Sequence, residues 1–87
     1  MYKIKNVRDK KNSEFVPLEV VDRIIDGENA VRVWRKYRGL KQQQLADRAG
    51  ISKAYLSQIE SNKRTGTIET LATLAKALNL TIDDLIR

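Results

Sequence analysis

The apolar residues between positions 29 and 87 recur every three or four residues, which is the spacing of one face of an α-helix. Gly39 follows the first apolar stripe and suits the C-terminal end of a helix. Gly50 separates the next two stripes, where a tight turn needs the left-handed backbone conformation that glycine adopts at little cost. The pattern predicts three successive helices with the inward-facing residues Ala30, Val33, Trp34, Tyr37, Leu45, Ala46, Ala49, Leu56 and Ile59.

Hydroxyl side chains precede the later helical segments and can cap them by accepting a backbone N–H hydrogen bond. Ser52 stands before the third helix, Thr67 before a fourth and Thr81 before a final turn. Asp83 and Asp84 lie at the positive N-terminal end of that turn, where carboxylates are favoured. The inward-facing residues of the last two elements are Ile68, Leu71, Leu74, Ala75, Leu78, Ile82, Leu85 and Ile86. This part of the chain is thus expected to form a unit of five helices.

The N-terminal part of the chain has a different pattern. Residues 2–7 begin with apolar and polar alternation, residues 9–12 are turn-like, and residues 13–16 follow as a second short segment. Together they predict a β-hairpin. Pro17 suits the first turn of a helix, so we expect a short helix over residues 17–26. Its apolar stripe is Val20, Val21, Ile24 and Ile25.

The expected fold is mainly α, with the five-helix unit at residues 29–87 and the hairpin and short helix in an extension at residues 1–28. The chain has no cysteine and no histidine, which excludes disulfides and removes the commonest catalytic base and metal ligand. We therefore expect no enzyme, no metal and no cofactor. No apolar run has the length of a membrane span, and the first residues lack the apolar stretch of a signal peptide. These features favour a cytoplasmic protein without a membrane partner.

The net charge of +6 is unevenly distributed along the chain. Residues 29–64 hold nine basic and two acidic side chains, a net charge of +7, whereas residues 1–28 are neutral and residues 65–87 carry −1. Clustered Lys and Arg neutralise nucleic-acid phosphates and release counterions, which gives binding that weakens steeply with salt. A basic segment is also typical of a solvated surface, so the charge needs a matching motif before it indicates nucleic acid.

The third predicted helix supplies that motif. Leu56 and Ile59 fall on one side of it, with Tyr55 at the edge. The opposite side carries Lys53, Ala54, Ser57 and Gln58. A DNA major groove admits a helix and is read by short polar side chains, amides and small apolar groups. The two short helices joined by a glycine turn therefore predict a DNA-binding helix-turn-helix.

The segment from residue 41 to residue 64, KQQQLADRAGISKAYLSQIESNKR, resembles the DNA-binding segment of the Cro/Xre family of bacterial and phage repressors. The matching residues are Gln42, Leu45, Ala46, Gly50, Ile51, Ser52, Leu56, Ser57, Ile59 and Glu60, with the later series Leu71, Leu74, Ala75 and Leu78. The resemblance implies a lambda-repressor-like five-helix fold. It also implies a salt bridge between Arg35 of the first helix and Glu60, which closes the recognition helix.

The resemblance further implies three kinds of DNA contact. The recognition helix would face base edges, Gln42 would bind a phosphate and brace that helix, and the basic loop after it would hold the DNA backbone. The base-reading candidates are Lys53, Ala54, Ser57 and Gln58. The other DNA-binding candidates are Gln42, Ser52, Tyr55, Asn62, Lys63 and Arg64. Gln43 and Gln44 are better explained as helix-forming residues on a wet face.

The chain departs from the family pattern in two places. Lys41 stands where the family commonly has a Thr or Ser cap, which predicts a less firm start of the second helix. Residues 65–67 lack the proline that often follows the basic loop, so we expect a looser loop around Arg64.

These features predict a sequence-specific repressor that binds a palindromic double-stranded operator as a homodimer. DNA binding does not require residues 1–28, so they would serve dimerisation or partner binding, or form a purely structural arm. This part resembles the N-terminal part of small antitoxins that pair with RelE-type ribonuclease toxins. In that case the chain would bind the toxin and repress its own operon.

Three alternatives remain beside this hypothesis. The first is a plain lambdoid-type repressor without a toxin. The second is a protein-interaction module that keeps the fold but has lost DNA binding, and the basic charge argues against it. The third is a magnesium-dependent nuclease, which would need carboxylates gathered in one cleft. The carboxylates that such an enzyme would use are Asp47, Glu60, Asp83 and Asp84, of which the salt bridge and the final helical turn already account for three.

Overall fold

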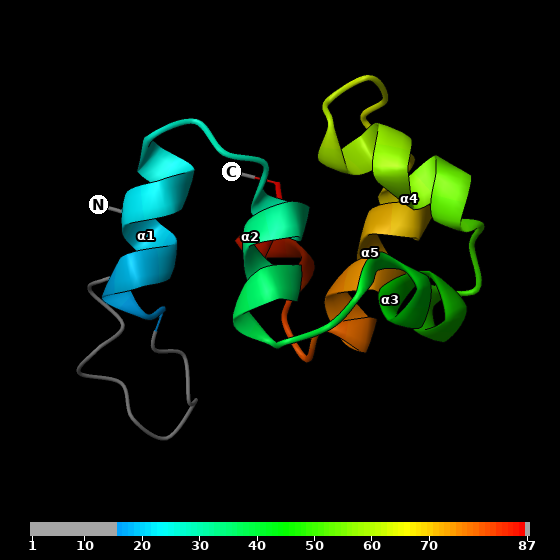
Figure 1. The fold of residues 1–87 in the computed structure, drawn as a ribbon, viewed down its shortest axis with the longest axis horizontal. Coiled ribbons are helices and arrows are strands. Elements are labelled where there is room, and N and C mark those ends of the chain that lie inside the picture. Colours follow the sequence, from blue (N-terminus) through cyan, green and yellow to red (C-terminus); the bar gives the residue numbers. More distant parts are fainter. Residues whose placement is uncertain (1–15, 87) are drawn as a thin grey trace.

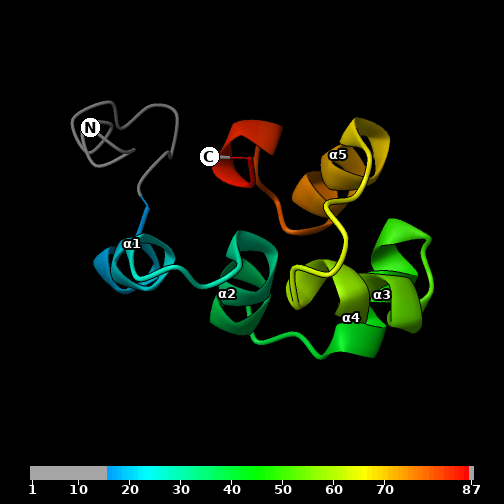
Figure 2. The same cartoon turned by 90° about the horizontal axis from the view of Figure 1, so that it is seen from above.

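The computed structural model describes residues 16–86, and these residues form helices and connecting turns only. The elements are α1 (Leu18–Ile25), α2 (Ala30–Tyr37), α3 (Gln42–Ala49), α4 (Lys53–Glu60), α5 (Ile68–Ala77) and the 3-10 turn η3 (Ile82–Asp84). Helix α2 lies between α1 and the other helices (Figure 1), and the view from above shows the same order (Figure 2). Helix α3 packs against α4 and α5, while α2 contacts both α1 and α4.

One hydrophobic core joins the five α-helices. Leu45, Leu56 and Leu74 come from α3, α4 and α5 and have no exposed surface. Burying a side chain of this size stabilises the fold by about 1.5–3 kcal/mol relative to leaving it in water. Val20 and Val21 add α1 to the same core. The remaining core residues are Val16, Val31, Val33, Trp34, Ala46, Ile59, Leu71, Ala75, Leu78 and Leu85.

The expected helix ends are confirmed at α3, α4 and α5. The Tyr55 backbone N–H donates to Ser52 Oγ at 3.0 Å, which caps α4. The Thr70 N–H donates to Thr67 Oγ1 at 3.0 Å, which caps α5. Gly50 ends α3 with a φ of 72°, in the left-handed region. Local hydrogen bonding and a permissive glycine thus set the boundaries of the helix pair that the sequence indicated.

The final turn has a capping box, in which Thr81 and Asp84 bond to each other. The Thr81 backbone N–H donates to Asp84 Oδ2 at 3.0 Å, and the Thr81 hydroxyl donates to the same oxygen at 3.1 Å. The carboxylate is the stronger acceptor because it carries charge, so it takes both donors.

The expected fold class is corrected in its N-terminal part. Between residues 16 and 86 there is no β-strand, so the described fold is all-helical. The hairpin expected at residues 2–16 lies outside the described residues except for Val16, which is buried in the core and is not part of a strand. The fifth expected helix is a single 3-10 turn. The physical reason is that apolar residues in the described segment follow helical spacing, and two-residue alternation occurs only before it.

Helical spacing also misjudged burial at the ends of several elements. Ile25, Ile68 and Ile86 were expected to face inward, but they are 69%, 65% and 47% exposed. Tyr37 is 42% exposed, whereas Val31, outside the expected stripe, is buried. The exposed residues lie at or next to the ends of their elements, where neighbouring helices no longer cover them. Periodicity shows which residues share a face, but it does not show how far the neighbours extend.

Candidate nucleic-acid interface

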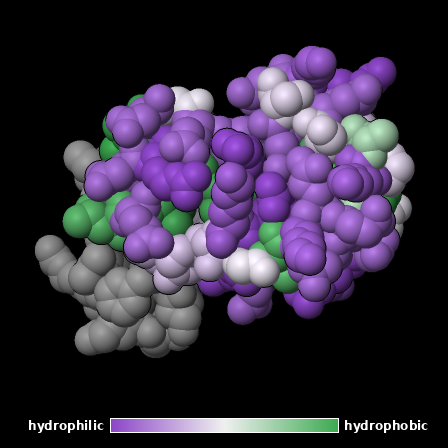
Figure 3. Space-filling view, in the orientation of Figure 1, coloured by the Kyte–Doolittle hydropathy of each residue, from purple (hydrophilic) through white to green (hydrophobic). Residues whose placement is uncertain are grey.

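The outward face of α4 is the centre of the candidate site. Leu56 and Ile59 are buried, as expected, and Tyr55 is half-buried at the edge of the core. Side chains three and four positions apart on a helix share a face. The four side chains on the opposite face are all exposed, and they are Lys53, Ala54, Ser57 and Gln58. The surface over α4 is mainly hydrophilic (Figure 3). The helix therefore presents a short polar ridge with one small apolar side chain.

The charges around this ridge are almost all positive. Residues 29–64 carry two acidic side chains. Of these, Glu60 is buried in an ion pair, and Asp47 accepts a hydrogen bond from Gln43 Nε2 at 2.8 Å. The exposed cations of this segment are Arg32, Lys36, Arg38, Lys41, Arg48, Lys53, Lys63 and Arg64. Such a surface attracts a polyanion and repels basic partners.

The expected salt bridge between Arg35 and Glu60 is confirmed. Arg35 Nε donates to Glu60 Oε2 at 2.7 Å, and Arg35 Nη2 donates to Glu60 Oε1 at 3.0 Å. Arg35 Nη1 also donates to the Leu40 carbonyl oxygen at 2.7 Å. The two-point geometry fixes orientation as well as distance. It holds the last residue of α4 against α2, so the orientation of α4 is restrained by a contact outside the α3–α4 pair.

Gln42 contacts the same ion pair. Its Nε2 donates to Glu60 Oε1 at 3.1 Å, so the start of α3 is linked to the end of α4. The bracing role expected for Gln42 therefore has a direct contact behind it, while its contact with a phosphate stays a prediction. The missing hydroxyl cap at Lys41 is partly offset, because the Lys41 backbone N–H donates to Gln44 Oε1 at 2.8 Å. Gln44 thus has a capping role that the sequence interpretation missed.

The loop after α4 is held more firmly than the absence of proline suggested. The backbone N–H groups of Lys63 and Arg64 both donate to the Gln58 carbonyl oxygen, at 2.9 and 3.2 Å. Asn62 has a φ of 66°, which reverses the chain at the end of the helix. The side chains of Lys63 and Arg64 are exposed. Two cations are therefore presented beside the polar ridge from a loop whose backbone is tied to α4.

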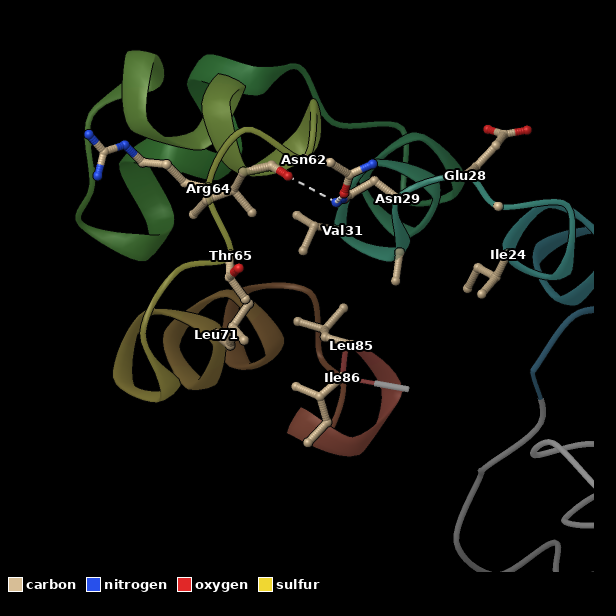
Figure 4. A pocket seen from close by; sticks show the side chains of 13 residues that line it. Ile24, Glu28, Asn29, Val31, Asn62, Arg64, Thr65, Leu71, Leu85 and Ile86 are labelled. Atoms are coloured by element: carbon tan, nitrogen blue, oxygen red, sulfur yellow. Dashed lines mark hydrogen bonds between the residues drawn. The ribbon is translucent and has the colours of Figure 1, made fainter.

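Asn29 is a residue of this region that sequence reasoning missed. Its Oδ1 accepts the Arg32 backbone N–H at 3.0 Å and caps α2. Its Nδ2 donates to the Ile59 carbonyl oxygen and to Asn62 Oδ1, both at 2.9 Å. The second of these bonds is drawn in Figure 4. Asparagine before an apolar stripe signals a helix cap, but no local pattern reveals the bonds to residues about thirty positions away.

The segment that leads into Asn29 is tied back to α1 by a surface ion pair. Arg23 Nη2 donates to Glu28 Oε1 at 2.9 Å, and Arg23 Nε lies 3.2 Å from both carboxylate oxygens. Hydrogen bonding from Arg23 lowers the pKa of the Glu28 carboxyl below its ordinary value. Both side chains are over one third exposed, so the pair adds little stability. It does restrain the connection between α1 and α2.

Candidate metal clusters and membrane-spanning helices are both absent from the described residues. In residues 16–86 no three His, Cys, Asp or Glu side chains gather as a metal site would require. No helix in that range is long and apolar enough to cross a membrane.

A cavity of about 450 Å³ opens between α1, the loop after α4 and the C-terminal turn, with walls that include Ile24, Val31, Leu71, Leu85 and Ile86 (Figure 4). Residues of the α4 polar ridge do not line it.

Comparison with known proteins gives a consistent result. The helix-turn-helix family model matches residues 31–85, which run from α2 through η3. Over 56 residues the chain is 39% identical to the control protein C.SmaI of Serratia marcescens, covering 64% of this chain and 67% of that protein. Over 60 residues it is 38% identical to the uncharacterized HTH-type transcriptional regulator y4dJ of Sinorhizobium fredii, covering 69% and 77%.

A phage protein is also similar to this chain. The immunity repressor protein of Bacillus phage phi105 is 34% identical over 56 residues, which are 64% of this chain and 39% of the repressor. The family match begins within α2, so α1 lies outside it.

Proposed function

Because this chain belongs to the helix-turn-helix family, of the Cro/Xre type, we propose that it is a sequence-specific DNA-binding transcription regulator whose α4 enters the major groove. The family is one of DNA-binding regulators and not of enzymes. The observation that carries the proposal is that α4 has two different faces. One face buries Leu56 and Ile59, and the other exposes polar side chains within a strongly basic segment. That combination fits a groove lined by phosphates.

Each candidate residue has a role that its position supports. Gln58 and Ser57 offer an amide and a hydroxyl to base edges, Ala54 fits a thymine methyl, and Lys53 reaches a base or a phosphate. The remaining candidates surround this set and face the sugar-phosphate backbone. They are Gln42, Ser52, Tyr55, Asn62, Lys63 and Arg64. Backbone contacts fix the register of the helix, whereas base contacts select the sequence.

The size of α4 supports a homodimer on a palindromic operator. Its eight residues rise about 12 Å, which matches only about four base pairs. One such contact cannot distinguish an operator within a genome. Two copies related by a twofold axis, with recognition helices about 34 Å apart, double the length of sequence that is read. Repression would then result from occupancy of a promoter.

The proposal is tested by binding the full chain to duplex DNA. Selection from a random duplex library should yield one palindromic sequence, and affinity for it should exceed that for random DNA and fall steeply as salt rises. Sedimentation of the complex should give two protein chains per selected site. Binding that is absent, or indifferent to both sequence and salt, would support the alternative of a protein-interaction module and end the regulator proposal.

A second function, the antitoxin role, is favoured by the surface of α1. Leu18 and Ile25 are 66% and 69% exposed, and hydrophobic surface is visible over α1 in Figure 3. Residues 16–28 carry four acidic side chains and one basic, the opposite of the DNA-binding segment. An apolar helix face with acidic neighbours suits a basic protein and not a phosphate backbone. We propose that α1, within the extension at residues 1–28, binds such a partner, a RelE-type toxin, while residues 29–87 bind DNA.

This second proposal has its own experiment. The chain is co-expressed with the product of the adjacent reading frame, which should be a small basic ribonuclease, and the pair is tested for co-purification. Changing both Leu18 and Ile25 to Ser should abolish capture and leave DNA affinity intact. A matched control, Thr73→Ser on the exposed face of α5, should change neither. Capture that survives the double change would remove α1 from the interface, and a neighbouring gene of another kind would remove the toxin.

A further inference from the structure

Asn29 uses both halves of its side-chain amide, and only one half is explained by helix capping. The oxygen accepts the Arg32 N–H, as an N-cap requires. Serine and aspartate cap as well as asparagine does, so this role alone does not call for an amide. The nitrogen is engaged elsewhere, 2.9 Å from the Ile59 carbonyl oxygen and 2.9 Å from Asn62 Oδ1.

The two bonds from Asn29 Nδ2 meet the chain where α4 ends. The Ile59 carbonyl belongs to the last turn of α4, and it also accepts the Asn62 backbone N–H at 3.1 Å, so Asn29 adds a side-chain donor to a backbone turn. Asn62 lies in the left-handed conformation that turns the chain out of the helix. Figure 4 shows Asn29 and Asn62 facing each other from α2 and the loop, while the Arg64 side chain extends away from them. The turn is therefore fixed from outside as well as by its own backbone.

The residues that follow this turn are the two exposed cations of the loop. Their backbone N–H groups share the Gln58 carbonyl oxygen, so Lys63 and Arg64 move together with the turn. A loop whose start is held both by α4 and by Asn29 loses less conformational freedom when it meets a ligand. Phosphate contacts depend on such placement, because fixing a mobile backbone on binding costs conformational entropy and reduces the net affinity that a Lys or Arg side chain adds.

We propose that Asn29 is a positioning residue for DNA binding, which holds the loop after α4 so that Lys63 and Arg64 meet the phosphates beside the recognition helix. This inference rests on the proposed function. Asn29 does not touch DNA itself in this role. It acts through Asn62. The preceding residue, Glu28, accepts a hydrogen bond from Arg23 of α1, so the same segment contacts both α1 and the loop after α4.

The decisive variant is Asn29→Ser. Serine keeps a neutral cap for α2 but is too short to reach Ile59 and Asn62, so α2 stays capped while the bridge is lost. With random duplex, the full-length variant should bind roughly fivefold to tenfold more weakly, the cost of losing a hydrogen bond or two. The slope of log affinity against log salt should fall by about 1 or more, because phosphate contacts are lost. The control Thr67→Ala removes another helix cap and should leave that slope unchanged.

A second pair of variants keeps the test independent of folding defects. Asn62→Gly accepts the positive φ without strain and removes the side-chain acceptor of Asn29, while the Ile59 carbonyl acceptor stays. If the two side chains act through one bond, the effects of Asn29→Ser and Asn62→Gly on affinity should be less than additive. Lys63→Ala should likewise cost less affinity in the Asn29→Ser background than in the parent chain.

The outcomes separate the inference from the function beneath it. A parent chain without salt-dependent DNA binding removes both. A parent that binds, with Asn29→Ser equal to it in affinity and salt slope, removes the positioning role and leaves the regulator. An Asn29→Ser variant that binds more weakly with an unchanged slope also overturns the inference, since the loss would then not come from phosphate contacts. Strict additivity with Asn62→Gly would show that the two residues act separately.

Discussion

Arg35 and Glu60 join α2 to the end of α4 through two parallel hydrogen bonds of 2.7 and 3.0 Å, with both residues buried. Arg35 also donates to the Leu40 carbonyl oxygen, and Glu60 also accepts a hydrogen bond from the Gln42 side-chain amide. A buried charge that loses its partner is costly, whereas a paired and hydrogen-bonded one is tolerated. Helix α4 is therefore attached to α2 by a pair in which the loss of either residue leaves a buried charge without its partner.

The first prediction concerns this pair. Glu60→Ala should lower the free energy of unfolding by about 3–5 kcal/mol, because Arg35 stays buried without its counter-charge. Urea unfolding followed by the fluorescence of Trp34, the single tryptophan, measures the change. Arg32→Ala, on the exposed face of the same helix, serves as the control and should change stability by no more than about 0.5 kcal/mol. Similar small values for both variants would mean that the pair contributes nothing to the fold.

The second prediction separates base reading from backbone binding. Gln58→Ala should weaken binding to the selected operator roughly tenfold to a hundredfold and affect random DNA much less. Lys63→Ala should weaken both alike and reduce the salt slope by about 1. Fluorescence anisotropy with both duplexes at several salt concentrations measures these effects, with Lys76→Ala on α5 as the control. Equal losses on both duplexes for Gln58→Ala would show that another face of the protein reads the bases.

The third prediction compares two glycines with positive φ. Gly50→Ala should cost about 1–2 kcal/mol, the strain of the left-handed conformation, because nothing lies within 4 Å of the added methyl group. Gly66→Ala should cost more, since its methyl group would also lie 3.3 Å from Ile59 Cδ1 in the core. Urea unfolding of the two variants side by side gives the comparison. If Gly66→Ala is no more destabilising, the core around Ile59 yields without cost.

The fourth prediction concerns pH and the connection between α1 and α2. Hydrogen bonding from Arg23 lowers the pKa of Glu28 in the folded chain, so the pair stabilises the fold at neutral pH and this contribution is lost as pH falls through the folded pKa. NMR titration of the Glu28 carboxyl should give a pKa below its ordinary value. Arg23→Gln should raise it, while the distant change Lys76→Gln should not. An unchanged titration in Arg23→Gln would mean that the bond does not persist in solution.

The sequence alone determined the helices from residue 29 onward and the outward face of α4. Both depend on interactions within one or two turns, where apolar spacing and capping side chains such as Ser52 and Thr67 act. The pairing of Arg35 with Glu60 came from a family resemblance, because no local rule links residues 25 positions apart. The N-terminal hairpin had only a weak alternation behind it, and the residues that the structure describes are helical.

The tertiary structure alone decided how the elements meet. It left Ile25 and Ile68 exposed despite their apolar spacing. It brought Asn29 within hydrogen-bonding distance of Asn62, and it tied Gln42 to the ion pair. Such contacts depend on the distances and angles between helices, which are set by the packing of the whole core. Local sequence patterns predict the direction in which each side chain points from its own helix. They do not predict which residue of another helix that side chain will contact.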